Sequence, residues 1–138
     1  MAKYFPVSPA IWNKRLLALG PTTALIYCYI LSNPHRNSEG LFRLPLAYVI
    51  ADLEMSREDV LQAFSDLGDE ELIRFDGEAE VLLDLNALFL LAPTSETQLK
   101  GAITKLRQVP RSPLLAEFHK LTIAYAPRLA EAVTEAFL

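Results

Sequence analysis

Between residues 40 and 53 the pattern of apolar positions changes from that of a strand to that of a helix. Gly40 to Leu44 predicts a short extended segment, and Pro45 suits the first position of a helix, where its missing N–H leaves no bond unmade. Apolar residues then recur at three- and four-residue spacing, namely Leu46, Val49, Ile50 and Leu53. The sequence therefore predicts a strand followed by an amphipathic helix.

A second helix is expected after a turn at Glu54 and Met55. Ser56 can cap this helix with its hydroxyl, and the carboxylate of Asp59 can return a hydrogen bond to the cap. Gly68 supplies the flexible residue at which such a helix usually ends. Its predicted buried face consists of Val60, Leu61, Phe64 and Leu67.

Two alternating segments follow and predict a hairpin. Residues 72–75 and 81–85 have the alternation of strands, and Asp76-Gly77 tolerates the positive φ angles of a tight turn. Strand, helix, turn, helix and hairpin in this order predict a winged helix-turn-helix, with the hairpin as the wing. The expected fold class is mainly α with a small β-wing (α+β), extended by C-terminal helices.

Helices are expected on both sides of this motif. Ser8-Pro9 predicts the start of a short helix with an apolar face of Ile11, Trp12 and Leu16. The apolar run over residues 22–31 favours a buried helix, although its β-branched and aromatic residues leave a strand open. Beyond residue 92, a capping box of Ser95 with Gln98, a second cap at Ser112 and breaks at 109–113 and Pro127 predict an all-helical tail, whose apolar positions include Leu115, Leu121 and Ile123.

We therefore expect two parts, a winged helix-turn-helix domain over residues 1–92 and a helical extension over residues 93–138. The chain has 138 residues, of which 51% are hydrophobic and 22% charged, so disorder is not expected. This apolar fraction exceeds what a small domain ordinarily needs. We expect part of it to face another subunit, so the extension is a candidate element for homo-oligomerisation or partner binding.

Three segments resemble the N-terminal winged-helix domain of replication-initiation proteins of phages and prophages. They are YFPVSPAIW from Tyr4, SNPHRNSEGLFRLPLAYVIADL from Ser32 and LIRFD from Leu72. The resemblance covers roughly residues 4–89 and is weaker around residues 100–118. It implies a non-enzymatic domain that contacts double-stranded DNA or scaffolds partners in replication or transcription control.

The charge distribution conflicts with simple DNA binding. Residues 40–84, which contain the predicted helix-turn-helix, carry three basic and twelve acidic side chains, whereas the whole chain has a net charge of only −4. DNA affinity comes largely from Lys and Arg side chains that displace counterions from phosphates. The segment most typical of DNA recognition is therefore the most acidic part of the chain.

If the domain binds DNA, the exposed start of the second helix should enter the major groove. Arg57 and Gln62 suit base edges there, and Ser56 lies beside them. Arg43 and Arg74 on the strands are candidates for phosphate contacts, although for them and Arg57 an internal ion pair remains an open alternative. The remaining basic candidates are Lys14, Arg15, His35 and Arg36, with Lys100, Lys105 and Arg107 in the tail.

The alternative hypothesis is a protein-interaction adaptor on the same scaffold. Its acidic face would dock on a basic replication or regulatory partner, or would remain a solvated surface. The residues of this face are Asp66, Asp69, Glu70, Glu71, Glu78 and Glu80.

Catalysis, metals and membranes are not predicted. Cys28 lies in an apolar run without a nearby basic residue, and neither His35 nor His119 has metal-ligand spacing to another ligand. No glycine-rich phosphate loop is present, so no cofactor is expected. The apolar runs are too short to span a bilayer, and the first residues lack the apolar core of a secretory signal, so we expect a cytoplasmic protein.

Overall fold

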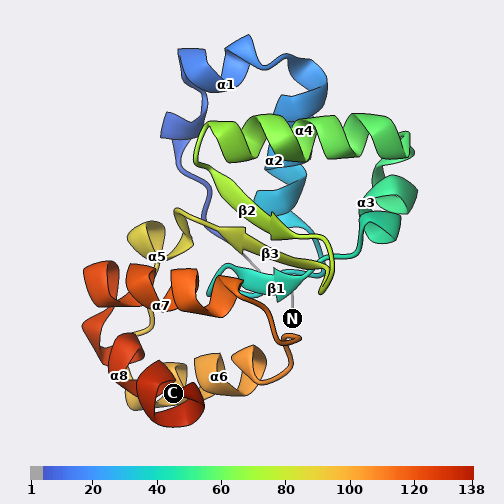
Figure 1. The fold of residues 1–138 in the computed structure, drawn as a ribbon. Helices are drawn as coiled ribbons and strands as arrows, with labels where there is room; N and C mark the ends of the chain where they lie inside the picture. Colours follow the sequence, from blue (N-terminus) through green and yellow to red (C-terminus); the bar gives the residue numbers. More distant parts are fainter. Residues whose placement is uncertain (1–4) are drawn as a thin grey trace.

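The computed structural model describes residues 5–138, and within them the protein has a mixed α+β structure (Figure 1). Eight α-helices of this part lie on both sides of one small antiparallel sheet. The α+β class expected from the sequence is therefore confirmed. Tyr4, where the first resembling segment begins, lies outside the described residues.

The N-terminal segment forms two short pieces where one helix was predicted. A 3₁₀ turn spans Pro9–Ile11, and α1 (Lys14–Ala18) starts anew because the side chain of Asn13 accepts a hydrogen bond from the Leu16 N–H at 3.0 Å. This break turns Trp12 outward. The residue is 58% exposed, so its predicted place on a buried face was wrong.

The next elements follow the predicted order. Helix α2 (Pro21–Ser32) confirms the buried helix expected over residues 22–31 and packs against α4 (Arg57–Asp69). Between them lie strand β1 (Leu41–Arg43) and helix α3 (Leu46–Leu53). Pro45 stands one position earlier than predicted, as the residue preceding α3.

Two left-handed residues set the angles at which α4 starts and ends. Glu54 (φ 53°) reverses the chain after α3, and the Ser56 hydroxyl then accepts a hydrogen bond from the Asp59 N–H at 3.1 Å. Helix α4 continues to Asp69, so the predicted end at Gly68 was wrong. Glu71 (φ 57°) adopts the left-handed conformation there, and the Leu72 N–H donates to the Leu67 carbonyl at 3.0 Å, as in a Schellman motif.

The predicted hairpin is present, with a different turn. Strands β2 (Ile73–Asp76) and β3 (Val81–Asp84) pair antiparallel, and Asp76 lies opposite Val81 within the sheet. The loop therefore has four residues, 77–80, and its left-handed residue is Glu80 (φ 57°), not Gly77. The side-chain oxygen of Asp76 accepts hydrogen bonds from the N–H groups of residues 78 and 79, which stabilises this wider turn.

The C-terminal part is all helical, as predicted. The capping box of Ser95 with Gln98 forms, and the Ser112 hydroxyl accepts a hydrogen bond from the Leu114 N–H at 3.1 Å. Ile123 is 59% exposed, so its predicted place in the apolar pattern was wrong. The helices are α5 (Ala87–Leu90), α6 (Glu96–Leu106), α7 (Leu114–Tyr125) and α8 (Pro127–Phe137).

The sheet, ordered β1-β3-β2, separates two hydrophobic cores. Alternate side chains of β3 point to opposite faces, so Leu82 packs with α2, α3 and α4, while Val81 and Leu83 pack with the C-terminal helices. Helix α7 contacts all three strands, and Figure 1 shows it on the face opposite α4. The C-terminal helices therefore complete the second core, while the predicted boundary at residue 92 stays a prediction.

No helix in residues 5–138 has the length and apolar content needed to cross a membrane.

Candidate functional site

The outward face of α4 is the surface that the sequence analysis singled out for binding. Its opposite face packs into the first core through Val60, Ala63, Phe64 and Leu67. Leu61 was predicted to be buried, but it is 41% exposed. One helical residue advances the side chain by about 100°, so Leu61 turns away from the core that holds Val60. An exposed leucine therefore lies on the outward face.

This outward face is acidic. Glu58, Asp59 and Asp69 are exposed on it, and Arg57 is the basic residue of the helix. Two carboxylates in the first turn suit the positive end of the helix dipole, which partly explains their presence. The amide of Gln62, predicted to contact a base, donates to the Asp66 carboxylate at 2.9 Å.

Acidic side chains also surround the hairpin loop. Glu78 is exposed, and Glu80 is half-buried beside Arg43. The Ser112 hydroxyl donates to Asp76 at 2.7 Å, and this hydrogen bond lowers the pKa of Asp76, assisted by the N–H groups of residues 79 and 78 and opposed by partial desolvation. Asp76 is therefore held in its charged form by the turn and by the segment before α7.

The two strand arginines predicted to hold phosphates have partners within the protein. The Arg43 guanidinium lies 3.7 Å from Glu80 and 5.7 Å from the ring centre of Tyr48. Arg74 donates to the carbonyls of Gly68 and Ile73 and lies 3.9 Å from Glu117. Both arginines therefore form internal ion pairs, which was the alternative left open for them.

The N-terminal candidates are spread over different surroundings. Lys14 is exposed at the start of α1, whereas Arg15 pairs with the Glu70 carboxylate at 2.6 Å. His35 lies 2.9 Å from the carboxylate of Asp52 and packs against the ring of Tyr48 at 4.7 Å. The Asp52 hydrogen bonds from Tyr29 and His35 lower the pKa of that carboxyl.

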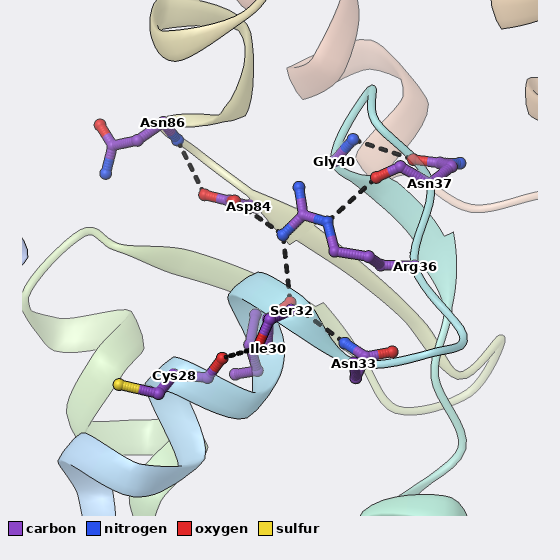
Figure 2. A network of polar contacts seen from close by, with 9 residues as sticks. All are labelled: Cys28, Ile30, Ser32, Asn33, Arg36, Asn37, Gly40, Asp84 and Asn86. Carbon is purple, nitrogen blue, oxygen red and sulfur yellow. Dashed lines mark hydrogen bonds and ion pairs between the residues drawn. The ribbon is translucent and has the colours of Figure 1, made fainter. Parts of the chain in front are cut away.

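Arg36 corrects the sequence prediction most clearly. It is 7% exposed, and Figure 2 shows its guanidinium between the end of α2 and strand β3. It donates to the Ile30 carbonyl at 3.1 Å, to the Asn37 carbonyl at 3.0 Å and to the Asp84 carboxylate at 3.2 Å. A side chain whose donors are used in this way holds the fold together, so its predicted role as an exposed DNA contact was wrong.

Burial is the main influence on the pKa values of Asp84, the partner of Arg36, and of Cys28. It raises the pKa of Asp84, against the opposing effect of Arg36 and of the Asn86 N–H. Burial also raises the pKa of the Cys28 thiol, which favours the neutral form.

A cleft of about 520 Å³ brings together basic residues that are distant in the sequence. Its basic lining residues are His35, Arg36, Arg43 and Lys105, with no carboxylate among the described residues that line it. All four are candidate basic residues in the sequence, but no local pattern places them beside one another.

Glu39 is a further residue of interest that no pattern in the sequence indicates. It is 5% exposed, and its Oε2 atom has no hydrogen-bond partner within residues 5–138. In the sequence it stands among turn-forming residues, where a glutamate is expected to be solvated. It lines a hollow together with residues between positions 91 and 105, and no local signal reports this proximity.

Among the described residues, no cluster of three or more His, Cys, Asp or Glu side chains could hold a metal ion. Comparison of the chain with known protein families, with curated proteins and with solved structures finds no match.

Proposed function

We propose that residues 21–84 form a winged helix-turn-helix. The order α2, β1, α3, α4, β2, β3 and the sheet order β1-β3-β2 are those expected for this fold, with α4 as the second helix of the helix-turn-helix. The support is strongest at the turn, where Glu54 and the Ser56 cap set α4 with one face outward.

We propose that the protein is a non-enzymatic interaction module that docks a basic protein partner on the outward face of α4. The observation that carries this proposal is an exposed Leu61 on a helix that also exposes Glu58 and Asp59 at its N-terminal end and Asp69 two turns beyond the leucine. An apolar centre with a charged rim is the usual anatomy of a protein interface. The resemblance to phage replication-initiation domains favours a replication or regulatory protein as the partner, in the cytoplasm.

The same electrostatics disfavour insertion of α4 into DNA. Charges within a screening length of about 8 Å at physiological salt still repel one another, and a helix in the major groove lies within that distance of phosphates. Glu58 and Asp59 occupy the N-terminal end that would meet the base edges. Ser56 is used as the helix cap and Gln62 is paired with Asp66.

A second candidate function is binding of double-stranded DNA through the basic cleft. The observation that favours it is the convergence of His35, Arg43 and Lys105 on one hollow without a lining carboxylate. Weak contacts of this kind gain strength in an assembly, so this candidate includes the predicted homo-oligomer. Light scattering at high micromolar concentration checks that assembly: a dimer or larger species is expected, and a clean monomer contradicts it.

One set of titrations separates the two candidates. Anisotropy is measured with a labelled amphipathic peptide bearing an arginine-rich face and with a labelled random duplex, across salt concentrations. We expect the peptide to bind, and the triple variant E58Q/D59N/D69N to weaken it at least tenfold. L61S should also weaken the peptide complex, because it removes apolar contact area without changing charge.

The matched control is E131Q/E135Q on α8, which removes carboxylates far along the chain from α4 and should leave peptide binding unchanged. A saturable duplex complex whose log affinity falls with log salt, and which K105A weakens, would instead support the basic cleft. Peptide binding that is indifferent to the α4 substitutions would reject the proposed docking face.

A further inference from the structure

A second cleft, of about 200 Å³, lies where the loop before β1 meets helix α6. Ser38 and Glu39 form one side, the segment after α5 forms another, and α6 contributes Gly101 and Lys105. The remaining lining residues are largely apolar and include Leu91, Ala92, Pro93 and Ala102. The cleft is thus a small hollow with apolar walls and one buried carboxylate.

One oxygen of the Glu39 carboxylate lacks a hydrogen-bond donor in this cleft. The residue is 5% exposed, and Oε2 is the buried side-chain atom of the described part that lacks a hydrogen-bond partner. A buried carboxylate oxygen without a donor is strongly unfavourable, and native proteins rarely leave one so. A water molecule or a group of a bound partner can supply the donor that Oε2 lacks within the described residues.

The loop that carries this carboxylate is closely packed at the residue after Glu39. Gly40, the next residue, has a φ of 84°, and a Cβ added to it would lie 2.4 Å from the Cβ of Ala87. The loop is therefore pressed against α5. Across the cleft, a Cβ at Gly101 would meet no atom within 4 Å, so the α6 side of the hollow is open.

We propose that this cleft binds an arginine side chain of a partner protein, with Glu39 accepting hydrogen bonds from the guanidinium. A guanidinium is a planar set of donors, is less strongly hydrated than an ammonium and is suited to buried pairing with a carboxylate. Its methylene stem can lie along the apolar walls. The site uses none of the α4 residues, so it goes beyond the docking face proposed above.

Lys105 is a cation of the protein itself that should weaken the binding of an arginine in this cleft. It also lines the cleft, but it makes no ion pair with Glu39 among the described residues. Its charge opposes a second cation, so Lys105→Met should strengthen arginine binding two- to fivefold.

The test is an NMR titration of the intact protein with N-acetyl-arginine amide, following the amides of Ser38 and Gly101. The neutral isostere N-acetyl-citrulline amide is the ligand control. We expect saturable shifts with arginine, at least a tenfold weaker response with citrulline, and loss of arginine binding in E39Q. The matched variant E78Q removes an exposed carboxylate on the hairpin loop and should bind as the unmodified protein does.

Gly101→Leu provides a second variant that leaves Glu39 in place. It fills the open side of the hollow with a better helix former, and it should abolish binding while the protein stays folded. Absence of saturable shifts, equal responses to citrulline, or unchanged affinity in E39Q or G101L would each overturn the proposal. These outcomes do not depend on α4, so the docking face stands or fails separately.

Discussion

At the scale of single residues, the buried pair of Arg36 and Asp84 joins parts of the chain that no local pattern connects. The Arg36 guanidinium reaches the Ile30 carbonyl at the last turn of α2 and the Asp84 carboxylate on β3 (Figure 2). A cation at the carboxyl end of a helix also interacts favourably with its dipole. Both side chains are nearly inaccessible, so removal of one leaves the other without a counter-charge.

Asp84→Asn should lower the free energy of unfolding by about 3–5 kcal/mol, because it leaves the buried guanidinium of Arg36 without a counter-charge. Chemical denaturation monitored by circular dichroism measures this change. The double variant R36M/D84N should lose less than the two single variants together, since no charge remains buried.

E80Q is the control for the buried pair. It breaks the exposed pair of Glu80 with Arg43 and should change stability by less than about 1 kcal/mol. A D84N variant as stable as E80Q would show that the buried pair does not hold α2 to the sheet.

The titration of Asp76 should make the stability of the protein depend on pH. Its pKa is lowered, first by the Ser112 hydroxyl, so the native state binds fewer protons there than the unfolded chain. This contribution to stability is complete above the unfolded pKa of about 3.9 and is lost as pH falls through the folded value. Ser112→Ala should raise the pKa of Asp76 and reduce the loss of stability between pH 7 and pH 3.

Residue-resolved carboxyl NMR titration follows Asp76 in S112A and in the unmodified protein, and denaturation midpoints at the two pH values give the stability change. Asp52, whose pKa is lowered by Tyr29 and His35, is the internal reference and should titrate identically in both proteins. An unaltered Asp76 titration in S112A would contradict the assignment of its main cause.

At the scale of elements, local signals placed most helices and strands, while the turns were predicted less well. The cap at Ser56 formed as expected, because a side chain bonding to a backbone N–H three residues away needs no distant contact. Gly20 and Gly40 adopt positive φ, but in the turns around α4 and in the hairpin the left-handed residues are Glu54, Glu71 and Glu80 instead of the nearby glycines that turn chemistry favours. These glutamates adopt a conformation that they do not prefer, in turns that local hydrogen bonds close, such as the bond from the Leu72 N–H to the Leu67 carbonyl.

Glu71→Gly should therefore raise the free energy of unfolding by about 1 kcal/mol, because glycine adopts positive φ without steric strain. Thermal or urea unfolding measures the gain. Glu70→Gly, at the neighbouring right-handed position (φ −84°), is the control and should be neutral or destabilising. A loss of stability in E71G would show that the Glu71 side chain contributes more than its backbone strain removes.

At the scale of the whole molecule, one three-stranded sheet serves both cores. β3 is buried at each of its positions, and α7 contacts all three strands. The predicted wing therefore has a covered face. Much of the apolar excess that suggested another subunit is used here, in the core that contains Leu41, Leu83, Phe118 and Leu129.

Because the two cores share a sheet, a substitution that destabilises the second core should also destabilise the first. Phe118→Ala should lower the free energy of unfolding by about 3–5 kcal/mol and reduce hydrogen-exchange protection in α4 as well as in α7. Ile123→Ala, on the exposed side of the same helix, is the control and should leave both unchanged. Protection lost in α7 alone would show that the two parts unfold independently.

The sequence by itself determined the α+β class, the order of the elements and the acidic character of α4, since these depend on periodicity, caps and composition within short stretches. The tertiary structure alone decided that Arg36 is internal, that Leu61 is exposed, that Glu39 is buried without a partner and that the sheet is covered on both faces. Each of these outcomes depends on contacts between segments far apart in the chain. Hydrophobic periodicity indicates only which residues are apolar enough to be buried, and not which surface covers them.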